Sequence, residues 1–393
     1  MESAVIAGAA RTPIGSFNGA LSAVPAPTLG GLVVQEALRR AGLDKGAVEE
    51  VVMGIVLAAG LGQAPARQAA LGAGLPDAVH CLTMNKMCGS GLMAVALAAQ
   101  AVRLGEAEVA VAGGMESMSR APYLLEQARA GYRMGDGRLI DSMIRDGLWD
   151  VYNDFHMGAA AELLCEKHQI TREEQDAYAA TSYTRALEAQ ARGWFADEIV
   201  PVSVPQRKGP PVEVTEDEEP KRGDVHRLAS LTPAFKPGGT VTAGNASSIN
   251  AGAAAVTVLS ERAARRPGVR PLVRILGTAT ASLQPEWFTI APIEAIKRLL
   301  GKLGLRADEI DLYEINEAFA AVAIAVTRGL GLPLEKVNVH GGAVALGHPI
   351  GASGARILTT LLYAMRTRGA RRGVASLCIG GGEAIAMAVE ACA

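Results

Sequence analysis

An internal repeat restricts the fold of this chain more than any other feature of its sequence. Three patterns in the first half recur in the second half in the same order: a helix end with a turn and a strand, a small-residue turn that opens an apolar helix, and a short strand that ends in glycines. The paired segments are 41–54 with 303–316, 88–105 with 351–369, and 108–114 with 373–382. Such a repeat predicts a duplicated structural unit.

The spacing of matching residues supports the duplication. The separations are nearly constant: 262 positions from Leu43 to Leu305, 263 from Ser90 to Ser353, and 267 from Gly113 to Gly380. Glycine-rich strand–helix units resemble one another, so the shared order and spacing count for more than any one match. Strands and helices alternate in each half, which predicts a mostly parallel, doubly wound sheet in each.

A segment without a counterpart interrupts the first half at about 115–245. It contains a helical pattern at 171–193, where Thr171 and Glu174 have the spacing of a capping box. A polar, proline-rich loop follows at 205–224. As an insertion, this segment is expected to form a substrate-binding lobe.

The length of the chain, 393 residues, exceeds a single ordinary core, so more than one domain is expected. We predict an N-terminal domain at 1–262, which carries the inserted lobe, and a C-terminal domain at 270–393. Hydrophobic residues make up 49% of the chain, aromatic residues only 4%, and there are 45 glycines. This composition is typical of helices that pack closely through alanine and glycine.

Composition also limits the expected partners and location. The net charge of −2 gives no electrostatic footprint for nucleic acid. The apolar stretches read as too short or too rich in glycine to span a bilayer, and the first residues lack the pattern of a signal peptide. The five cysteines form no CxxC pair and no metal-type spacing, so we expect a reducing, cytoplasmic location and no metal.

Cys88 lies in NKMCGSGLMAV, at the predicted N-terminus of an apolar helix. The free N–H groups and the dipole of a helix start stabilise a thiolate and lower its pKa. Gly89 and Gly91 would let a substrate approach the backbone closely. The alternative is a buried structural cysteine, which is what most unpaired cysteines are.

His348 lies in a glycine-rich Gly-His-Pro loop just before the second small-residue helix. Taken alone, it is either a loop histidine bonded to the backbone or a titrating group. The repeat aligns GASG at 351–354 with CGSG at 88–91. Two related helix N-termini that meet at a pseudo-twofold axis would bring thiol and imidazole together, as a nucleophile and its base require.

Two further positions carry polar groups at strand ends. Cys378 ends the last buried strand and enters a triple-glycine turn, whose backbone N–H groups could hold an oxyanion; the alternative is a core cysteine. Asn316 and Glu317 follow an apolar strand in YEINEAFA. They are either a helix cap or site groups at the C-terminal edge of a sheet.

Five motifs in this order resemble those of the thiolase family: NKMCGSGLMAV, VAGGMESMS, YEINEAFA, VHGGAVALGHPIGASGARIL and CIGGG. The resemblance runs almost end to end and includes the inserted lobe. It implies a duplicated thiolase-type α/β fold: two doubly wound mixed sheets with helices in αβαβα layers, plus an inserted loop lobe. It also implies an acyltransferase that condenses two acetyl-CoA molecules to acetoacetyl-CoA and CoA, reversibly, with no cofactor beyond these CoA thioesters.

The resemblance implies a role for each catalytic position. Cys88 is the nucleophile that becomes acylated, and His348 takes its thiol proton. Cys378 moves the second proton, from the α-carbon of an incoming acetyl-CoA or onto a departing one. Asn316 orients a water at one oxyanion hole, with His348 as the other donor. The backbone N–H groups of Cys88 and Gly380 form the second hole.

The resemblance also implies contacts with CoA. The residues expected to line the pantetheine channel are His156, Met157, Phe235, Ala243, Ser247 and Phe319. Lys221 or Arg222 is expected to meet the adenine and phosphate end. Phe235 and Met157 could instead be core residues.

The sequence departs from the commonest thiolase pattern at NASSINAG (245–252), EWFTIAP (286–292) and GGGEAIA (380–386). The last stretch has Glu383 and Ala384 where a small or apolar residue and a glycine are frequent. The middle stretch is expected to shape the acyl pocket, with Phe288 and its neighbour Trp287 filling volume that a long acyl chain would need. The alternative is that both rings pack inside the C-terminal domain.

Other functions share some of these features. A ketoacyl-carrier-protein synthase would normally pair its cysteine with two histidines, or with a histidine and an asparagine, and not with a second cysteine such as Cys378. A degradative 3-ketoacyl-CoA thiolase of broader chain length and a non-catalytic thiolase-like CoA or lipid carrier remain alternatives. A redox protein is disfavoured because neither reactive cysteine has a resolving partner nearby in the sequence.

The resemblance implies a homo-oligomer as well, either a dimer or a tetramer. Related chains pair through the sheet edge of the N-terminal domain, which we expect near 109–118. Many also form tetramers through the inserted lobe. Closed symmetry is the usual outcome for such enzymes.

Overall fold

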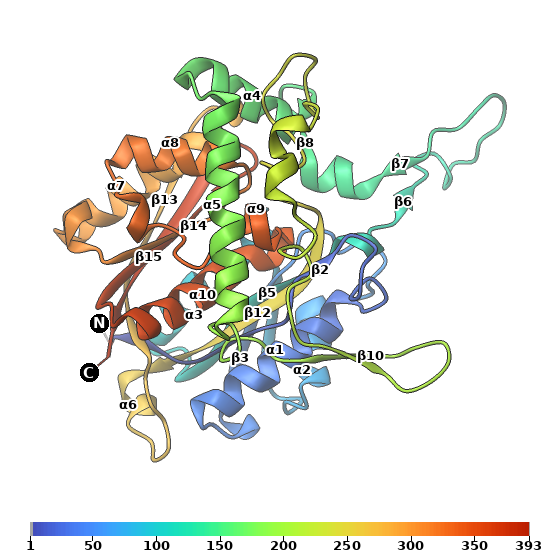
Figure 1. The fold of residues 1–393 in the computed structure, drawn as a ribbon. Helices are drawn as coiled ribbons and strands as arrows, with labels where there is room; N and C mark the ends of the chain where they lie inside the picture. Colours follow the sequence, from blue (N-terminus) through green and yellow to red (C-terminus); the bar gives the residue numbers. More distant parts are fainter. Residues whose placement is uncertain (1–2, 393) are drawn as a thin grey trace.

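Both halves of the chain contribute to one continuous sheet in the computed structural model, which describes residues 3–392 (Figure 1). The strand order is β14-β15-β16-β13-β1-β12-β5-β3-β4, with the short β2 beside β12. The strands of the first half are β1 (Ala4–Arg11), β2 (Gly15–Ser16), β3 (Glu50–Gly54), β4 (His80–Met84), β5 (Val109–Ser117) and β12 (Asn250–Ser260). Those of the second half are β13 (Val273–Ser282), β14 (Leu312–Ile315), β15 (Arg372–Ile379) and β16 (Glu383–Ala391).

The order of elements confirms the predicted duplication. The helices of the first half are α1 (Ala26–Ala41), α2 (Pro65–Gly72) and α3 (Ser90–Leu104), and their counterparts are α7 (Ala291–Leu303), α8 (Ala320–Leu330) and α10 (Ser353–Arg368). In the described part of the chain, the second half has no counterpart of β4 as a full strand. At the equivalent position, β14, the counterpart of β3, pairs in parallel with Val337 through a single bridge. The two units join where β1 pairs with β13.

The sheet is mixed, as the family resemblance implies, and the prediction of mostly parallel strands was wrong. Among the strands named above, within residues 3–392, parallel pairs occur only toward the two ends of the sheet, between β3 and its neighbours β4 and β5 and between β14 and β15. The ladder between them is antiparallel. The physical reason is plain at β15–β16, because a tight glycine turn at 380–382 can join two strands only in antiparallel fashion.

Alternating side chains place helices on both faces of each half-sheet. In β5, Val109, Val111 and Met115 face a core with α1 and α2, whereas Ala110 and Ala112 face a core with α3 and α10. Strand β15 alternates in the same way between the central core and the core formed by α7 and α8. The helices α3 and α10 therefore lie between the half-sheets of the two units, which confirms the αβαβα arrangement, although β1 and β13 join the two expected sheets into one (Figure 1).

Glycines let the two central helices meet at their N-termini. A β-carbon on Gly91 would lie 2.6 Å from the backbone nitrogen of Ala355. Its counterpart Gly354 would place a β-carbon 2.3 Å from the backbone nitrogen of Leu92. These contacts are reciprocal, as expected about a pseudo-twofold axis, and both are too close for any other residue.

The inserted lobe occupies 118–249, between β5 and β12. It contains α4 (Met157–His168), α5 (Arg172–Ala191) and the hairpins β6 (Tyr123–Leu124) with β7 (Ile140–Asp141), β8 (Trp149–Asp150) with β9 (Phe155–His156), and β10 (Val202–Val204) with β11 (Val212–Val214). The predicted capping box of Thr171 and Glu174 is present at the start of α5. Both lobe helices pack on the core of α7 and α8, so the lobe lies over the second half of the chain.

Shorter helical elements outside the lobe include α6 (Glu261–Ala264), α9 (Ala343–Leu346) and the single turn η8 (Ile350–Ala352). Within residues 3–392, one segment, Met87–Leu104, is long and apolar enough to cross a membrane by length and composition, so the expectation that the apolar stretches are too short or too rich in glycine was wrong for this helix. It is α3 with the turn before it, and it packs in the central core between the sheet layers.

Adding one methyl group at the helix crossing is expected to destabilise the protein. Gly91→Ala and Gly354→Ala each force a β-carbon into backbone, and overpacking of this kind costs about 1–3 kcal/mol in the free energy of unfolding. Gly301→Ala, in α7, is the matched control, because a β-carbon there meets no atom within 4 Å of the described chain. Thermal unfolding should show lower midpoints for the first two variants only, and equal midpoints for all three would contradict the crossing.

Candidate active site

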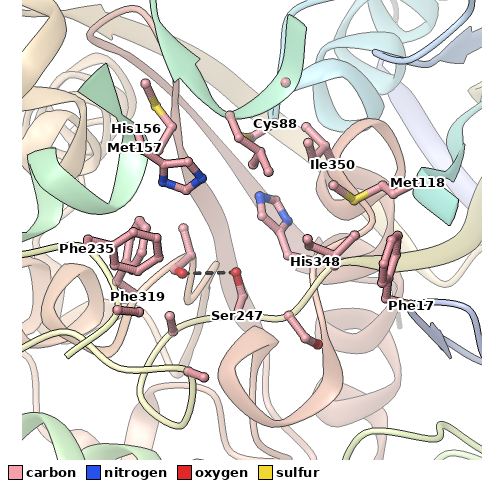
Figure 2. A pocket seen from close by; sticks show the side chains of 18 of the residues that line it. Phe17, Cys88, Met118, His156, Met157, Phe235, Ser247, Phe319, His348 and Ile350 are labelled. Atoms are coloured by element: carbon pink, nitrogen blue, oxygen red, sulfur yellow. Dashed lines mark hydrogen bonds between the residues drawn. The ribbon is translucent and has the colours of Figure 1, made fainter. Parts of the chain in front are cut away.

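A pocket of about 410 Å³ opens where the start of α3, the loop before α10 and the inserted lobe meet (Figure 2). Three of the predicted catalytic residues line it: Cys88, His348 and Gly380. Cys378 and Asn316 are fully buried and lie outside the lining. The wall is otherwise mainly apolar, which suits an extended, partly apolar ligand.

The turn before α3 holds Cys88 in a strained loop. Met87 has a φ of 48°, a left-handed conformation that is unfavourable for this side chain. Two interactions of the Ser90 hydroxyl fix the turn: it accepts the N–H of Lys86 at 2.8 Å and donates to the carbonyl of Met87 at 2.6 Å. The turn therefore presents Cys88 to the pocket immediately before the helix begins.

Burial dominates the ionisation of the Cys88 thiol. It raises the pKa of this group to about 11, although hydrogen bonds from the backbone N–H groups of Gly380 and Cys88 favour the thiolate. The negative charge of Glu116 adds to the rise. The prediction that the helix start lowers this pKa was wrong in sign, because loss of hydration outweighs the dipole. The resting nucleophile is a thiol that needs a base.

His348 is arranged to act as that base. Its Nδ1 lies 2.6 Å from the hydroxyl of Ser353, which itself donates to the carbonyl of Pro349 at 2.9 Å. Ser353 Oγ is thus left to accept a hydrogen bond from the ring, so Nδ1 carries the hydrogen and Nε2 keeps its lone pair. Nε2 has no hydrogen-bond partner among residues 3–392. Burial, with the positive charge of Arg356, lowers the pKa of the ring to about 3, so the imidazole is neutral.

Cys378 lies beside the nucleophile at the end of β15. Burial raises the pKa of its thiol well above the usual value, and the nearby Cys88 raises it further. Asn316 places its Nδ2 3.5 Å from Nδ1 of His348, too far for a strong hydrogen bond. Its Oδ1 has no protein partner in the described chain, which leaves it free to hold a water.

The helix-cap alternative for Asn316 and Glu317 is wrong, because the residue before α8 is Phe319 and no side chain caps that helix. The carboxylate of Glu317 is buried and accepts hydrogen bonds from lobe and core alike. The donors are Tyr178 Oη at 2.9 Å, Ser182 Oγ at 2.7 Å, Asn338 Nδ2 at 2.8 Å and the N–H of Val344 at 3.0 Å. Glu317 therefore fastens the lobe to the strand end that carries Asn316.

A second buried carboxylate, Glu116, was not predicted. It accepts the N–H groups of Val56 at 3.0 Å, Leu57 at 3.2 Å and Gly351 at 2.9 Å. Burial raises the pKa of this carboxyl to about 7. These hydrogen bonds connect the turn after His348 with the first half of the chain. In the sequence, the sign of such a buried carboxylate is a single acidic residue within a run of small and apolar ones.

Seven of the eight predicted CoA contacts line the pocket: His156, Met157, Arg222, Phe235, Ala243, Ser247 and Phe319. Lys221 does not; its ammonium forms an ion pair with Glu216 on the surface. The ring of Phe235 stacks on His156 with centroids 4.9 Å apart and meets Phe319 edge-on at 6.1 Å (Figure 2). These rings form an aromatic wall opposite the helix start.

The two aromatic residues of EWFTIAP, Trp287 and Phe288, have different surroundings. Phe288 is buried and lines the pocket, as predicted for an acyl-pocket residue. Trp287 lies outside the lining, with Lys167 Nζ over its ring at 3.8 Å. The pocket also contains apolar residues that were not predicted as site residues: Phe17, Met118, Leu148 and Ile350. Ser353 was missed as well, although the repeat aligns it with Ser90.

Among residues 3–392, no group of three or more histidine, cysteine, aspartate or glutamate side chains is arranged to hold a metal ion. The five cysteines are free thiols. The polar groups that line the pocket at its centre are the thiol of Cys88, the imidazole of His348 and the backbone of Gly380.

Alkylation of Cys88 by iodoacetamide should rise with pH well beyond neutrality. Because burial raises the pKa of the thiol to about 11, the thiolate fraction grows throughout pH 8–10 instead of levelling off near the usual cysteine value. Rates measured by mass spectrometry at the Cys88 peptide test this. A plateau below pH 8 would mean that the helix start prevails over burial.

Comparison with known proteins agrees with this geometry. The family model for the thiolase N-terminal domain matches residues 4–262, and that for the thiolase C-terminal domain matches residues 269–391. An acetyl-CoA acetyltransferase of Pseudomonas aeruginosa is 54% identical over 98% of this chain and 99% of its own length. One of Cupriavidus necator is 53% identical over 99% and 100%, and acetyl-CoA acetyltransferase 2 of Arabidopsis thaliana is 53% identical over 98% and 96%.

Solved structures have the same fold. The acetyl-CoA acetyltransferase of Bacillus anthracis superposes with a TM-score of 0.97 at 44% identity and covers 100% of this chain and 99% of its own. A thiolase of Ascaris suum in complex with coenzyme A superposes with a TM-score of 0.94 at 43% identity, over 99% and 100%. Similarity at this level over the whole length leaves one conclusion: the chain belongs to the thiolase family.

Proposed function

We propose that this enzyme transfers an acetyl group between CoA thioesters: it condenses two acetyl-CoA molecules to acetoacetyl-CoA and CoA, and it catalyses the reverse thiolysis. The observation that carries the proposal is the meeting, in one pocket, of a thiol, a neutral imidazole with a free Nε2, and a backbone N–H directed at the sulfur. A nucleophile, a base and an oxyanion donor are the parts that acyl transfer needs.

In the first half-reaction, His348 Nε2 takes the proton of Cys88, and the sulfur attacks the thioester carbonyl. The N–H groups of Cys88 and Gly380 stabilise the resulting oxyanion. The C–S bond to CoA then breaks, and Cys378 gives its proton to the departing CoA thiolate. The acetyl group is left on Cys88, with a thiolate at Cys378 and an imidazolium at His348, which stabilise each other in a site closed to bulk water.

In the second half-reaction, the Cys378 thiolate removes a proton from the α-carbon of a new acetyl-CoA. The enolate oxygen accepts hydrogen bonds from the His348 imidazolium and from a water held by Asn316. The carbanion attacks the acetyl group on Cys88, the C–S bond breaks, and His348 returns its proton to the Cys88 thiolate. The α-proton remains on Cys378, so the enzyme is restored to its starting state.

CoA would enter along the aromatic wall formed by His156, Phe235 and Phe319. Arg222, and not Lys221, is the better candidate for the phosphate end. Arg222 lines both the main pocket and an adjoining depression of about 370 Å³, where Glu219 and Ala243 are also found. No cofactor besides the CoA thioesters takes part in the proposed reaction, and free thiols suit work in the reducing cytoplasm.

Acetyl-CoA is expected to modify Cys88 alone. Peptide mass mapping after incubation should find one acetyl group there, and a label on Cys378 or Cys165 would contradict the assignment.

Cys378→Ser should retain part of this acylation but lose condensation by about 10²–10⁴-fold, the scale of a positioned acid or base. Equal, complete loss of both steps in a folded variant would indicate a structural role for Cys378.

The acyl pocket is expected to favour short chains because Phe288 fills part of it. Each added methylene contributes only about 0.8 kcal/mol of binding, so a wall should appear as an abrupt drop in kcat/KM. Steady-state assays should show acetoacetyl-CoA cleaved far better than a six- or eight-carbon 3-ketoacyl-CoA. Phe288→Ala should raise relative activity on the longer substrate. Equal turnover of both by the unmodified enzyme would favour the degradative alternative.

The enzyme is proposed to act as a homo-oligomer, a dimer or a dimer of dimers. The predicted edge near 109–118 was wrong, because β5 lies between β3 and β12. The edge strand of this half is β4, whose outer side has unpaired backbone groups. Leu82 on this strand is 44% exposed, and an edge of this kind favours pairing with another copy of the chain. The β6–β7 hairpin projects from the body and exposes Met134 by 99%, a second surface for assembly (Figure 1).

Leu82→Lys should lower the assembly state because it puts a charge on the β4 edge. Light scattering at micromolar concentration should show an oligomer for the unmodified protein and smaller species for the variant. A monomeric unmodified protein, or an unchanged variant, would contradict the pairing.

A further inference from the structure

Glu383, one of the departures from the common thiolase pattern, lies beside the catalytic centre. It is the first residue of β16, three positions after Gly380. Its Oε2 lies 2.5 Å from Nζ of Lys86, which precedes Cys88 by two positions. The ion pair thus connects the turn that carries the nucleophile, in the first half of the chain, with the β15–β16 turn in the second half.

The turn that carries Cys88 and the β15–β16 turn are in contact, although they are far apart in the sequence. A β-carbon on Gly89 would lie 2.4 Å from Cδ1 of Ile379, so the backbone of the first turn packs closely against the side chain that precedes the second. The β15–β16 turn contains Gly381 and Gly382, both with a φ of 91°, and glycine-rich backbone of this kind is readily deformed. The position of such a turn therefore depends in part on the groups that contact it.

Lys86 is well placed to transmit that restraint. Its backbone N–H donates to Ser90 Oγ at 2.8 Å, and its carbonyl accepts the N–H of Gly89 at 3.0 Å. Its backbone is therefore part of the turn that presents Cys88. With side chains 23% and 35% exposed, Lys86 and Glu383 form a pair that is only partly screened by solvent.

We propose that the Lys86–Glu383 ion pair is a positioning device for acyl transfer. It fixes the separation between the backbone N–H of Cys88 and the backbone N–H of Gly380, the two donors to the oxyanion formed at the acylated sulfur. The inference rests on the proposed function, because that function assigns the oxyanion to these donors. Neither side chain of the pair contacts the reacting atoms in this assignment.

Glu383→Gln should lower kcat about tenfold while KM for acetyl-CoA stays within about twofold. Loss of a whole oxyanion donor costs about 10²–10³-fold in kcat, so a displaced donor should cost part of that. Glu390→Gln is the matched control. Glu390 also lies on β16 and pairs with Arg372 of β15 at 2.9 Å with similarly limited exposure (18% and 22%), but at the far end of the strand pair. This control should leave kcat unchanged.

A second measurement separates positioning from general disturbance of the site. Alkylation of Cys88 by iodoacetamide forms no oxyanion and uses the Gly380 N–H only to favour the thiolate, so Glu383→Gln should slow alkylation far less than it slows acetylation by acetyl-CoA, which should fall about tenfold. The exchanged pair, Lys86→Glu with Glu383→Lys, should restore most of the acetylation rate. Thermal midpoints establish that the variants are folded.

The outcomes distinguish this proposal from the function on which it rests. If the unmodified enzyme acetylates Cys88 and Glu383→Gln matches it, the positioning role is overturned and the proposed function stands. A parallel fall of alkylation and acetylation, or a failure of the exchanged pair to restore activity, would also overturn positioning. If the unmodified protein never acetylates Cys88, the function fails and this proposal fails with it.

Discussion

The contact between the N-termini of α3 and α10 is the constraint on which the rest of the molecule depends. At that crossing each helix presents a glycine, Gly91 or Gly354, to the backbone of the other, and no larger residue fits. Each helix is preceded by a loop that carries a reacting group, Cys88 before α3 and His348 before α10. The duplicated fold brings the two loops together. Because their sequences differ, one loop supplies the nucleophile and the other supplies the base.

Close packing at this crossing also sets the ionisation of the site. The two sheet layers and the inserted lobe exclude water, so burial raises the pKa of Cys88 to about 11 and lowers that of His348 to about 3. Thiol and imidazole therefore rest in their neutral forms. Charge would arise only when a proton moves between them, at the moment when Gly380 and the other backbone donors can stabilise it. A preorganised, neutral site of this kind avoids the cost of keeping ions buried between turnovers.

Much of this arrangement follows from the sequence. The repeat predicts two related units and the placing of Cys88 near His348, because three patterns recur in order at nearly constant spacing. The capping box at Thr171 follows from local chemistry alone and is present. The family resemblance supplied the mixed sheet and about half of the residues that line the pocket.

Other features depend on contacts between distant segments, which local patterns do not encode. The antiparallel centre of the sheet depends on how β15 turns into β16, and alternation of helices and strands does not reveal it. The sign of the Cys88 pKa shift depends on how much water the assembled layers exclude. The three backbone bonds to Glu116 join residues 59, 60 and 235 positions apart. The edge strand β4 became apparent only once the order of strands was known.

The most direct test of the central claim is a double-mutant cycle on the rate of Cys88-site acylation by acetyl-CoA. The variants are Cys88→Ser, His348→Asn and their combination, measured in single-turnover experiments. If the helix crossing makes nucleophile and base one unit, each single variant should lose nearly as much rate as the double variant, because neither group works without the other. Losses that simply multiply in the double variant would show that the two residues act independently, and would contradict the account.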